Sequence, residues 1–95
     1  MNNIILELAR LDSKLYQYRG WVFALIGDYD SVLADFNRAI ELSPDDSRIY
    51  IRRGLVWSKK GEGDKAIADY DKAYIINSSD PNPVKFRDGL INRGK

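Results

Sequence analysis

Apolar side chains recur along the chain at the spacing of amphipathic helices, and polar or glycine-containing breaks separate the helical stretches. The clearest apolar stripe predicts a helix from about residue 29 to 42 and consists of Val32, Leu33, Phe36, Ala39 and Ile40. Similar patterns favour helices at about 2–8, 12–26, 46–60, 64–76 and 83–92. The sequence therefore predicts an all-α protein with six helices.

Polar residues at the breaks indicate where these helices begin and end. Pro44 ends the helix at 29–42, and the residues expected to cap helix N-termini are Asp12 or Ser13, Asp46 or Ser47, and Asp64. Gly27-Asp28 is expected to form one turn between helices, and residues 61–63 are expected to form a looser one.

One stretch of the chain occurs twice. Residues 20–44 return, with changes, at residues 54–78, and the identical pairs, each 34 residues apart, are Gly20/Gly54, Gly27/Gly61, Asp30/Asp64, Ala34/Ala68, Asp35/Asp69 and Ala39/Ala73. Residues 6–20 align with 40–54 at the same offset, and residues 84–90 align with 49–55 at an offset of 35. The chain is therefore an internal repeat with a partial unit at each end.

The order of residue types within the repeat resembles the tetratricopeptide repeat family, whose period is 34 residues. The matching positions are Tyr16, Gly20, Phe23, Phe36, Ala39 and Pro44 in the first unit and Tyr50, Gly54, Trp57, Tyr70 and Ala73 in the second. Both units carry Arg, Arg19 and Arg53, where the family pattern has Leu.

The resemblance implies a right-handed α-solenoid of antiparallel helix hairpins, with about two full repeats flanked by half repeats. We expect one domain over residues 1–95. Within it, 1–11 is the second helix of a partial repeat, 12–45 and 46–80 are repeats, and 81–95 is the first helix of a partial repeat.

Two kinds of contact are expected to hold each hairpin together. Gly20 and Gly54 lie inside helices, where glycine is unfavourable, so we expect each to admit a bulky ring, from Phe36 and Tyr70 respectively. Arg19 and Arg53 each precede an acid, Asp35 and Asp69, by 16 residues, which favours an ion pair within each repeat. The alternative is that either Arg is available to a ligand. Trp57 is expected in the core.

Composition argues against catalysis. The 95 residues include no histidine and no cysteine, which removes the commonest general base and the thiolate nucleophile. No metal-ligand spacing, phosphate loop or nucleophile–base pair is present, so we expect no enzyme activity, cofactor or metal. The sequence shows no leader pattern and no apolar run of membrane-spanning length, which favours a cytoplasmic protein without a membrane partner.

The resemblance also implies a concave groove, lined by the first helices of successive units, that binds a protein or peptide. The positions it assigns to this groove are Lys14, Gln17, Trp21, Leu25, Arg48, Ile51, Arg52, Leu55, Lys59, Phe86 and Arg87, with Ser58 and Leu90 beside them. Residues 47–60 carry five basic side chains and no acid, so an acidic partner with apolar anchors would be complementary. The alternative is a solvated basic face.

Self-association and nucleic-acid binding are further possibilities. Trp21 is a ligand anchor, a self-association contact or a core residue, and the apolar ends of the chain favour a homo-oligomer by end stacking. The basic helix 47–60 could bind nucleic acid, although the net charge of +1 gives no overall attraction to it.

Overall fold

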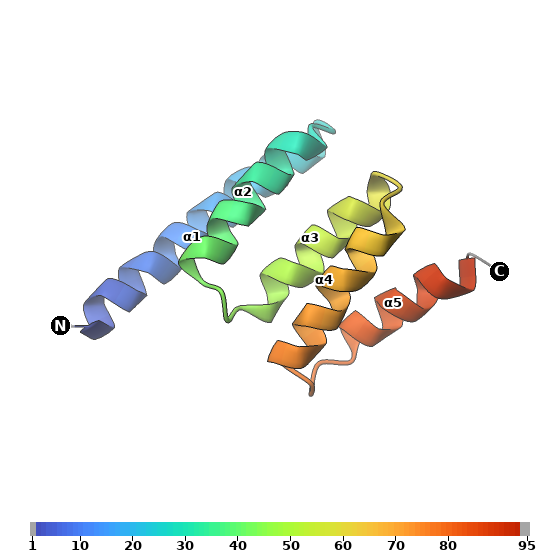
Figure 1. Ribbon diagram of the computed structural model, residues 1–95. Coiled ribbons are helices and arrows are strands. Elements are labelled where there is room, and N and C mark those ends of the chain that lie inside the picture. The colour runs from blue at the N-terminus through green and yellow to red at the C-terminus, as the bar shows by residue number, and fades with distance from the viewer. Residues whose placement is uncertain (1, 94–95) are drawn as a thin grey trace. The chain divides into compact units, whose positions relative to one another are not determined.

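The computed structural model describes residues 2–93, which form five helices (Figure 1). These are α1 (Asn2–Leu25), α2 (Tyr29–Leu42), α3 (Ser47–Lys59), α4 (Gly63–Ile76) and α5 (Asn82–Arg93). The predicted all-α class is confirmed. Residues 1, 94 and 95, which belong to the expected ranges 1–11 and 81–95, lie outside the described part.

The chain divides into two compact units between Asp45 and Asp46. The first unit is the hairpin of α1 and α2, and the second contains the hairpin of α3 and α4 followed by α5, which packs on α4. In Figure 1 the two helices of each hairpin lie side by side. The repeat boundaries inferred from the sequence stay predictions.

The expected break before Asp12 is wrong. Residues 2–25 form one helix, so the segment at 2–8 is its beginning and not a separate element. Ser13 is buried inside this helix, where its hydroxyl donates a hydrogen bond to the Ala39 carbonyl of α2 at 3.0 Å. A tertiary hydrogen bond therefore satisfies the side chain that the sequence suggested as an N-cap.

Of the two other expected caps, one is confirmed and one is wrong. Asp46 precedes α3 as expected, and its carboxylate accepts a hydrogen bond from the Arg48 backbone N–H at 3.1 Å. Asp64 is not a cap: α4 begins at Gly63, and Asp64 lies in its first turn. An acid there still interacts favourably with the positive end of the helix dipole.

The two hairpin turns have the same backbone conformation, so the looser second turn was a wrong expectation. Gly27 has φ 77° and Gly61 has φ 81°, values in the left-handed region that glycine favours. In each turn the next backbone N–H bonds to a carbonyl five residues back, at 3.0 Å from Asp28 and 2.9 Å from Glu62. This is the glycine-terminated helix end, and Gly63 is free to begin α4.

Helix-internal glycines bring the helices of each hairpin close together, as predicted. A Cβ on Gly20 would lie 2.9 Å from Cε1 of Phe36, and one on Gly54 would lie 2.5 Å from Cε1 of Tyr70. Both rings are fully or almost fully buried. The aromatic side chain therefore fills the space that any larger residue in place of glycine would occupy.

The predicted ion pairs are also confirmed. Arg19 binds both carboxylate oxygens of Asp35 at 2.8 and 2.6 Å, and Arg53 binds those of Asp69 at 2.8 and 2.7 Å. The hydrogen bond to Asp69 raises the pKa of the Arg53 guanidinium, although partial burial opposes the rise. Both Arg side chains hold the helices of their own unit together.

Trp57 is not a core residue, contrary to expectation. Its side chain is half-buried, and the Lys65 ammonium lies 4.5 Å from its ring centroid. A cation over the face of an indole is an attractive arrangement at a partly exposed site. Trp57 therefore packs beneath lysine side chains at the surface of the second unit.

Candidate functional site

The expected groove residues of the first unit lie on α1 with different exposures. Lys14 and Trp21 are exposed, and Leu25 is 86 % exposed at the end of the helix. The Trp21 ring makes an edge-to-face contact with Phe36 at 6.1 Å between centroids. Trp21 is therefore a surface residue with one edge supported by the hairpin, which excludes the ordinary-core interpretation.

Gln17 does not present its side chain to solvent. It is 3 % exposed, and its amide donates a hydrogen bond to the Ser13 hydroxyl at 3.4 Å. Because Ser13 in turn bonds to Ala39, Gln17 extends a short polar network beneath α1. This network explains why a polar residue is tolerated there.

In the second unit, α3 and α5 bring several of the expected groove residues together. They surround a pocket of about 260 Å³, whose lining residues are Leu55, Ser58, Tyr70, Lys85, Phe86, Gly89 and Leu90. The family resemblance assigned Leu55, Ser58, Phe86 and Leu90 to the groove, but not Tyr70, Lys85 or Gly89. The pocket combines the apolar side chains of Leu55, Phe86 and Leu90 with polar groups that include the Ser58 hydroxyl and the Lys85 ammonium.

The pocket exists because α5 is not covered on the side of Gly89. This glycine matches Gly54 at the 35-residue offset, yet no atom lies within 4 Å of the position its Cβ would take. Phe86, one helical turn earlier, packs against Tyr70 with ring centroids 5.7 Å apart. The repeat offset, which places Gly89 at the position of Gly54, was the signal that could have identified it.

Two of the expected basic groove residues are already paired with acids. Arg48 bonds to Asp46 at 3.1 Å, and Arg87 bonds to Asp71 at 3.0 Å. The hydrogen bond to Asp71 raises the pKa of the Arg87 guanidinium, so Arg87 stays charged at any ordinary pH. These arginines stabilise the second unit.

The remaining groove positions of the second unit differ in exposure. Ile51 and Arg52 are half-buried on α3, and Lys59 is exposed at its end. Within residues 3–92, neither Lys59 nor Lys85 takes part in an ion pair. Lys85 is therefore the cation of the pocket that can meet an incoming acid.

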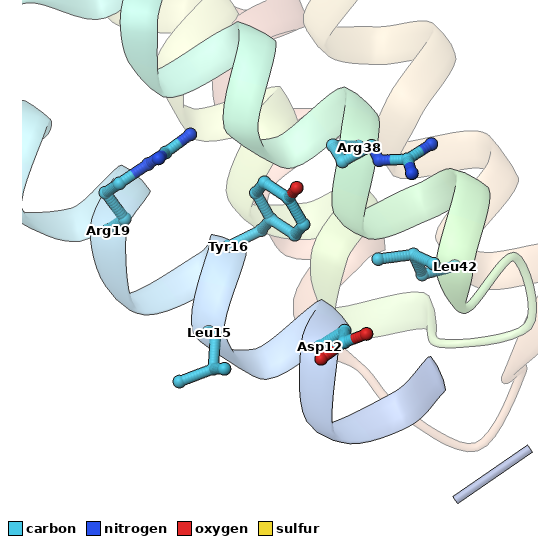
Figure 2. Close-up of a pocket in the computed structure, with 6 residues that line it drawn as sticks. All are labelled: Asp12, Leu15, Tyr16, Arg19, Arg38 and Leu42. Atoms are coloured by element: carbon cyan, nitrogen blue, oxygen red, sulfur yellow. The ribbon is translucent and has the colours of Figure 1, made fainter. Parts of the chain in front are cut away.

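A second pocket, of about 360 Å³, lies in the first unit between α1 and α2 (Figure 2). Figure 2 shows Tyr16 projecting from α1 toward Arg38 of α2. Hydrogen bonds, first to Glu41 and then to Tyr16, raise the pKa of the Arg38 guanidinium, and the Glu41 contact is 2.7 Å. The other lining arginine, Arg19, is paired with Asp35. Both cations of this pocket thus already have an acidic partner within the chain.

Within the described residues, no three acidic, histidine or cysteine side chains gather closely enough to hold a metal ion. In the same part of the chain, no helix combines the length and apolar content needed to cross a bilayer.

The two hairpins, their helix-internal glycines and their turns define a helical-repeat fold of the tetratricopeptide type. The chain is similar to two crystal structures of MamA, with TM-scores of 0.70 and 0.73 and 24 % sequence identity in each case. In both comparisons 85 % of this chain is covered, and the chain spans about half the length of the MamA structures, 50 % and 53 %. No protein-family model and no curated protein sequence matches the chain.

Proposed function

We propose that the protein is a non-catalytic interaction module that binds a segment of another protein through the second unit. The observation that carries this proposal is the pocket between α3 and α5, where Leu55, Phe86 and Leu90 form apolar walls. Binding pockets typically combine such walls with a few polar groups that fix orientation. The helical-repeat fold supports the same function, because these folds present extended binding surfaces.

The chemistry of the pocket defines the kind of segment that fits. Its volume of about 260 Å³ accommodates one large apolar side chain, and Lys85 at its edge favours an acidic residue beside that anchor. The expected partner is therefore a peptide with a Phe or Leu flanked by Asp or Glu. The ion pairs of Arg48 and Arg53 leave the basic helix less available to phosphates, which favours a peptide over nucleic acid.

Fluorescence polarisation with a panel of labelled peptides tests this proposal. The panel consists of short peptides with one Phe or Leu among Glu residues, the same peptides with Ala as the anchor, and the same peptides with Lys in place of Glu. We expect binding only when both the apolar anchor and the acids are present. Absence of binding across the whole panel contradicts the proposal.

Gly89→Leu provides the matched variant. The leucine should fill the pocket without disturbing the fold, because nothing lies within 4 Å of the Gly89 Cβ position. The control is Gly63→Leu, at a glycine that is equally open but lies on α4 outside the pocket. We expect peptide affinity to fall at least tenfold in Gly89→Leu only; equal affinity in both variants means that the peptide binds elsewhere.

A further inference from the structure

Helix α1 carries a second apolar stripe that α2 does not cover. Its residues are separated alternately by four and three positions, which is the heptad spacing of coiled coils. Each side chain is between 56 % and 86 % exposed, and the members of this stripe, here called the α1 seam, are Ile4, Leu8, Leu11, Leu15, Tyr18, Val22 and Leu25.

The seam is distinct from the face of α1 that builds the hairpin. That face contains Ser13 and Gly20, which are buried against α2, together with the half-buried Phe23. Residues two positions apart on a helix point about 200° from one another, so Leu11 and Leu15 lie on the opposite side from Ser13. A soluble monomer rarely exposes so many large apolar side chains in one line.

We propose that the α1 seam pairs with the α1 seam of a second copy of this chain, in antiparallel orientation. The proposal is independent of peptide binding in the second unit, since the two use different helices.

Flanking charges disfavour the parallel orientation. In a parallel coiled coil, the residue just before a seam position such as Leu8 or Leu15 lies close to the residue five positions further along the other helix. Glu7 would then face Asp12 of the second copy, and Lys14 would face Arg19 of the second copy. Both contacts join like charges, which destabilises the pair.

One antiparallel register buries the seam between Leu8 and Leu25 completely. A shift of the two copies by seven residues from this register would place Asp12 against Asp12 and Lys14 against Lys14. A shift by fourteen residues would leave Val22 without a facing residue. In the favoured register the facing residues of the two copies are Leu8 with Leu25, Leu11 with Val22, and Leu15 with Tyr18.

The flanks of this register are complementary. Asp12 faces Arg19 of the second copy, whose side chain is 61 % exposed although it also binds Asp35 of its own hairpin. Within residues 3–92, Asp12 takes part in no ion pair. Lys14 faces Trp21 of the second copy, where an ammonium can lie over the exposed indole. Each contact occurs twice because the two-fold axis repeats it.

Sedimentation equilibrium of the full chain tests the oligomeric state. We expect a dimer for the wild type and a monomer for Leu15→Glu, because the substitution places charges at the centre of the seam. The matched control is Ile75→Glu, which changes an equally exposed apolar residue on α4 and should remain dimeric. Circular dichroism should show unchanged helix content in both variants. A monomeric wild type, or a dimer that survives Leu15→Glu, overturns the proposal.

Cysteine cross-linking tests the orientation, since the chain has no native cysteine. In the antiparallel register, an oxidised mixture of the single variants Leu8→Cys and Leu25→Cys should form a disulfide between the two variants. Neither variant alone should cross-link, because identical positions lie about 25 Å apart along the helices. A cross-link within either variant alone, or its absence from the mixture, overturns the antiparallel arrangement.

Discussion

The three helix-internal glycines Gly20, Gly54 and Gly89 occupy equivalent repeat positions but have different surroundings. We expect Gly54→Ala to destabilise the protein by about 1–3 kcal/mol, because the new Cβ would overlap the Tyr70 ring. Gly89→Ala should instead stabilise it by about 0.5–1 kcal/mol, since alanine favours the helix and meets no atom. Urea unfolding followed by circular dichroism measures both. Gly20→Ala should lie between them, and equal effects at Gly54 and Gly89 would contradict the close packing.

The Asp28 carboxylate provides a pH-dependent contribution to the start of α2. It accepts hydrogen bonds from the Ser31 hydroxyl at 2.7 Å and from the Ser31 backbone N–H at 3.2 Å, and these lower the pKa of Asp28 below its usual value of 3.8. The folded pKa lies below the unfolded one, so this stabilisation is fully present above the unfolded pKa. It is lost as the pH falls through the folded pKa.

Asp28→Ala should therefore lower the free energy of unfolding at neutral pH, and the difference from the wild type should shrink as the pH falls below about 4. Urea unfolding at a series of pH values measures this difference. The control is Asp45→Ala, an exposed acid outside the helices that should show no comparable pH-dependent loss. A difference that grows toward acid pH would show that Asp28 does not act as a carboxylate cap.

At the scale of the element, α1 shows how a local signal can be overridden. Asp12 and Ser13 favour a helix start, but the hydroxyl of Ser13 finds its partner in the Ala39 carbonyl of the neighbouring helix. A sequence pattern cannot distinguish these two partners, because a cap and a tertiary hydrogen bond use the same side chain. Asp46, whose partner is local, was predictable.

A pair of substitutions at Ser13 tests the continuity of α1. Inside a helix, glycine is less favourable than alanine by about 1 kcal/mol, whereas at an N-cap glycine is preferred. Both substitutions remove the bond to Ala39, so the difference between them reports only the backbone environment. We expect Ser13→Gly to unfold at lower urea concentration than Ser13→Ala; the reverse order would restore the break that the sequence suggested.

For the whole molecule, contacts encoded within one repeat were predictable and contacts outside the repeat pattern were not. The glycine–aromatic and Arg–Asp pairs followed from the 34-residue period, since both partners recur together. The pocket at Gly89 and the α1 seam were not identified. Two apolar stripes overlap on α1, and only the position of α2 shows which one is left uncovered.

Self-association through the seam has a consequence for the stability of the whole molecule. If the folded chain dimerises and the unfolded chain does not, mass action makes the melting temperature rise with protein concentration. We expect this rise in the wild type and in Ile75→Glu over about a hundredfold range of concentration. Leu15→Glu should melt at a temperature independent of concentration, because it removes the dimer while keeping the hairpin contacts of α1, which lie on the opposite face. Differential scanning calorimetry distinguishes the two behaviours, and a wild-type melting temperature that does not change with concentration would contradict the dimer.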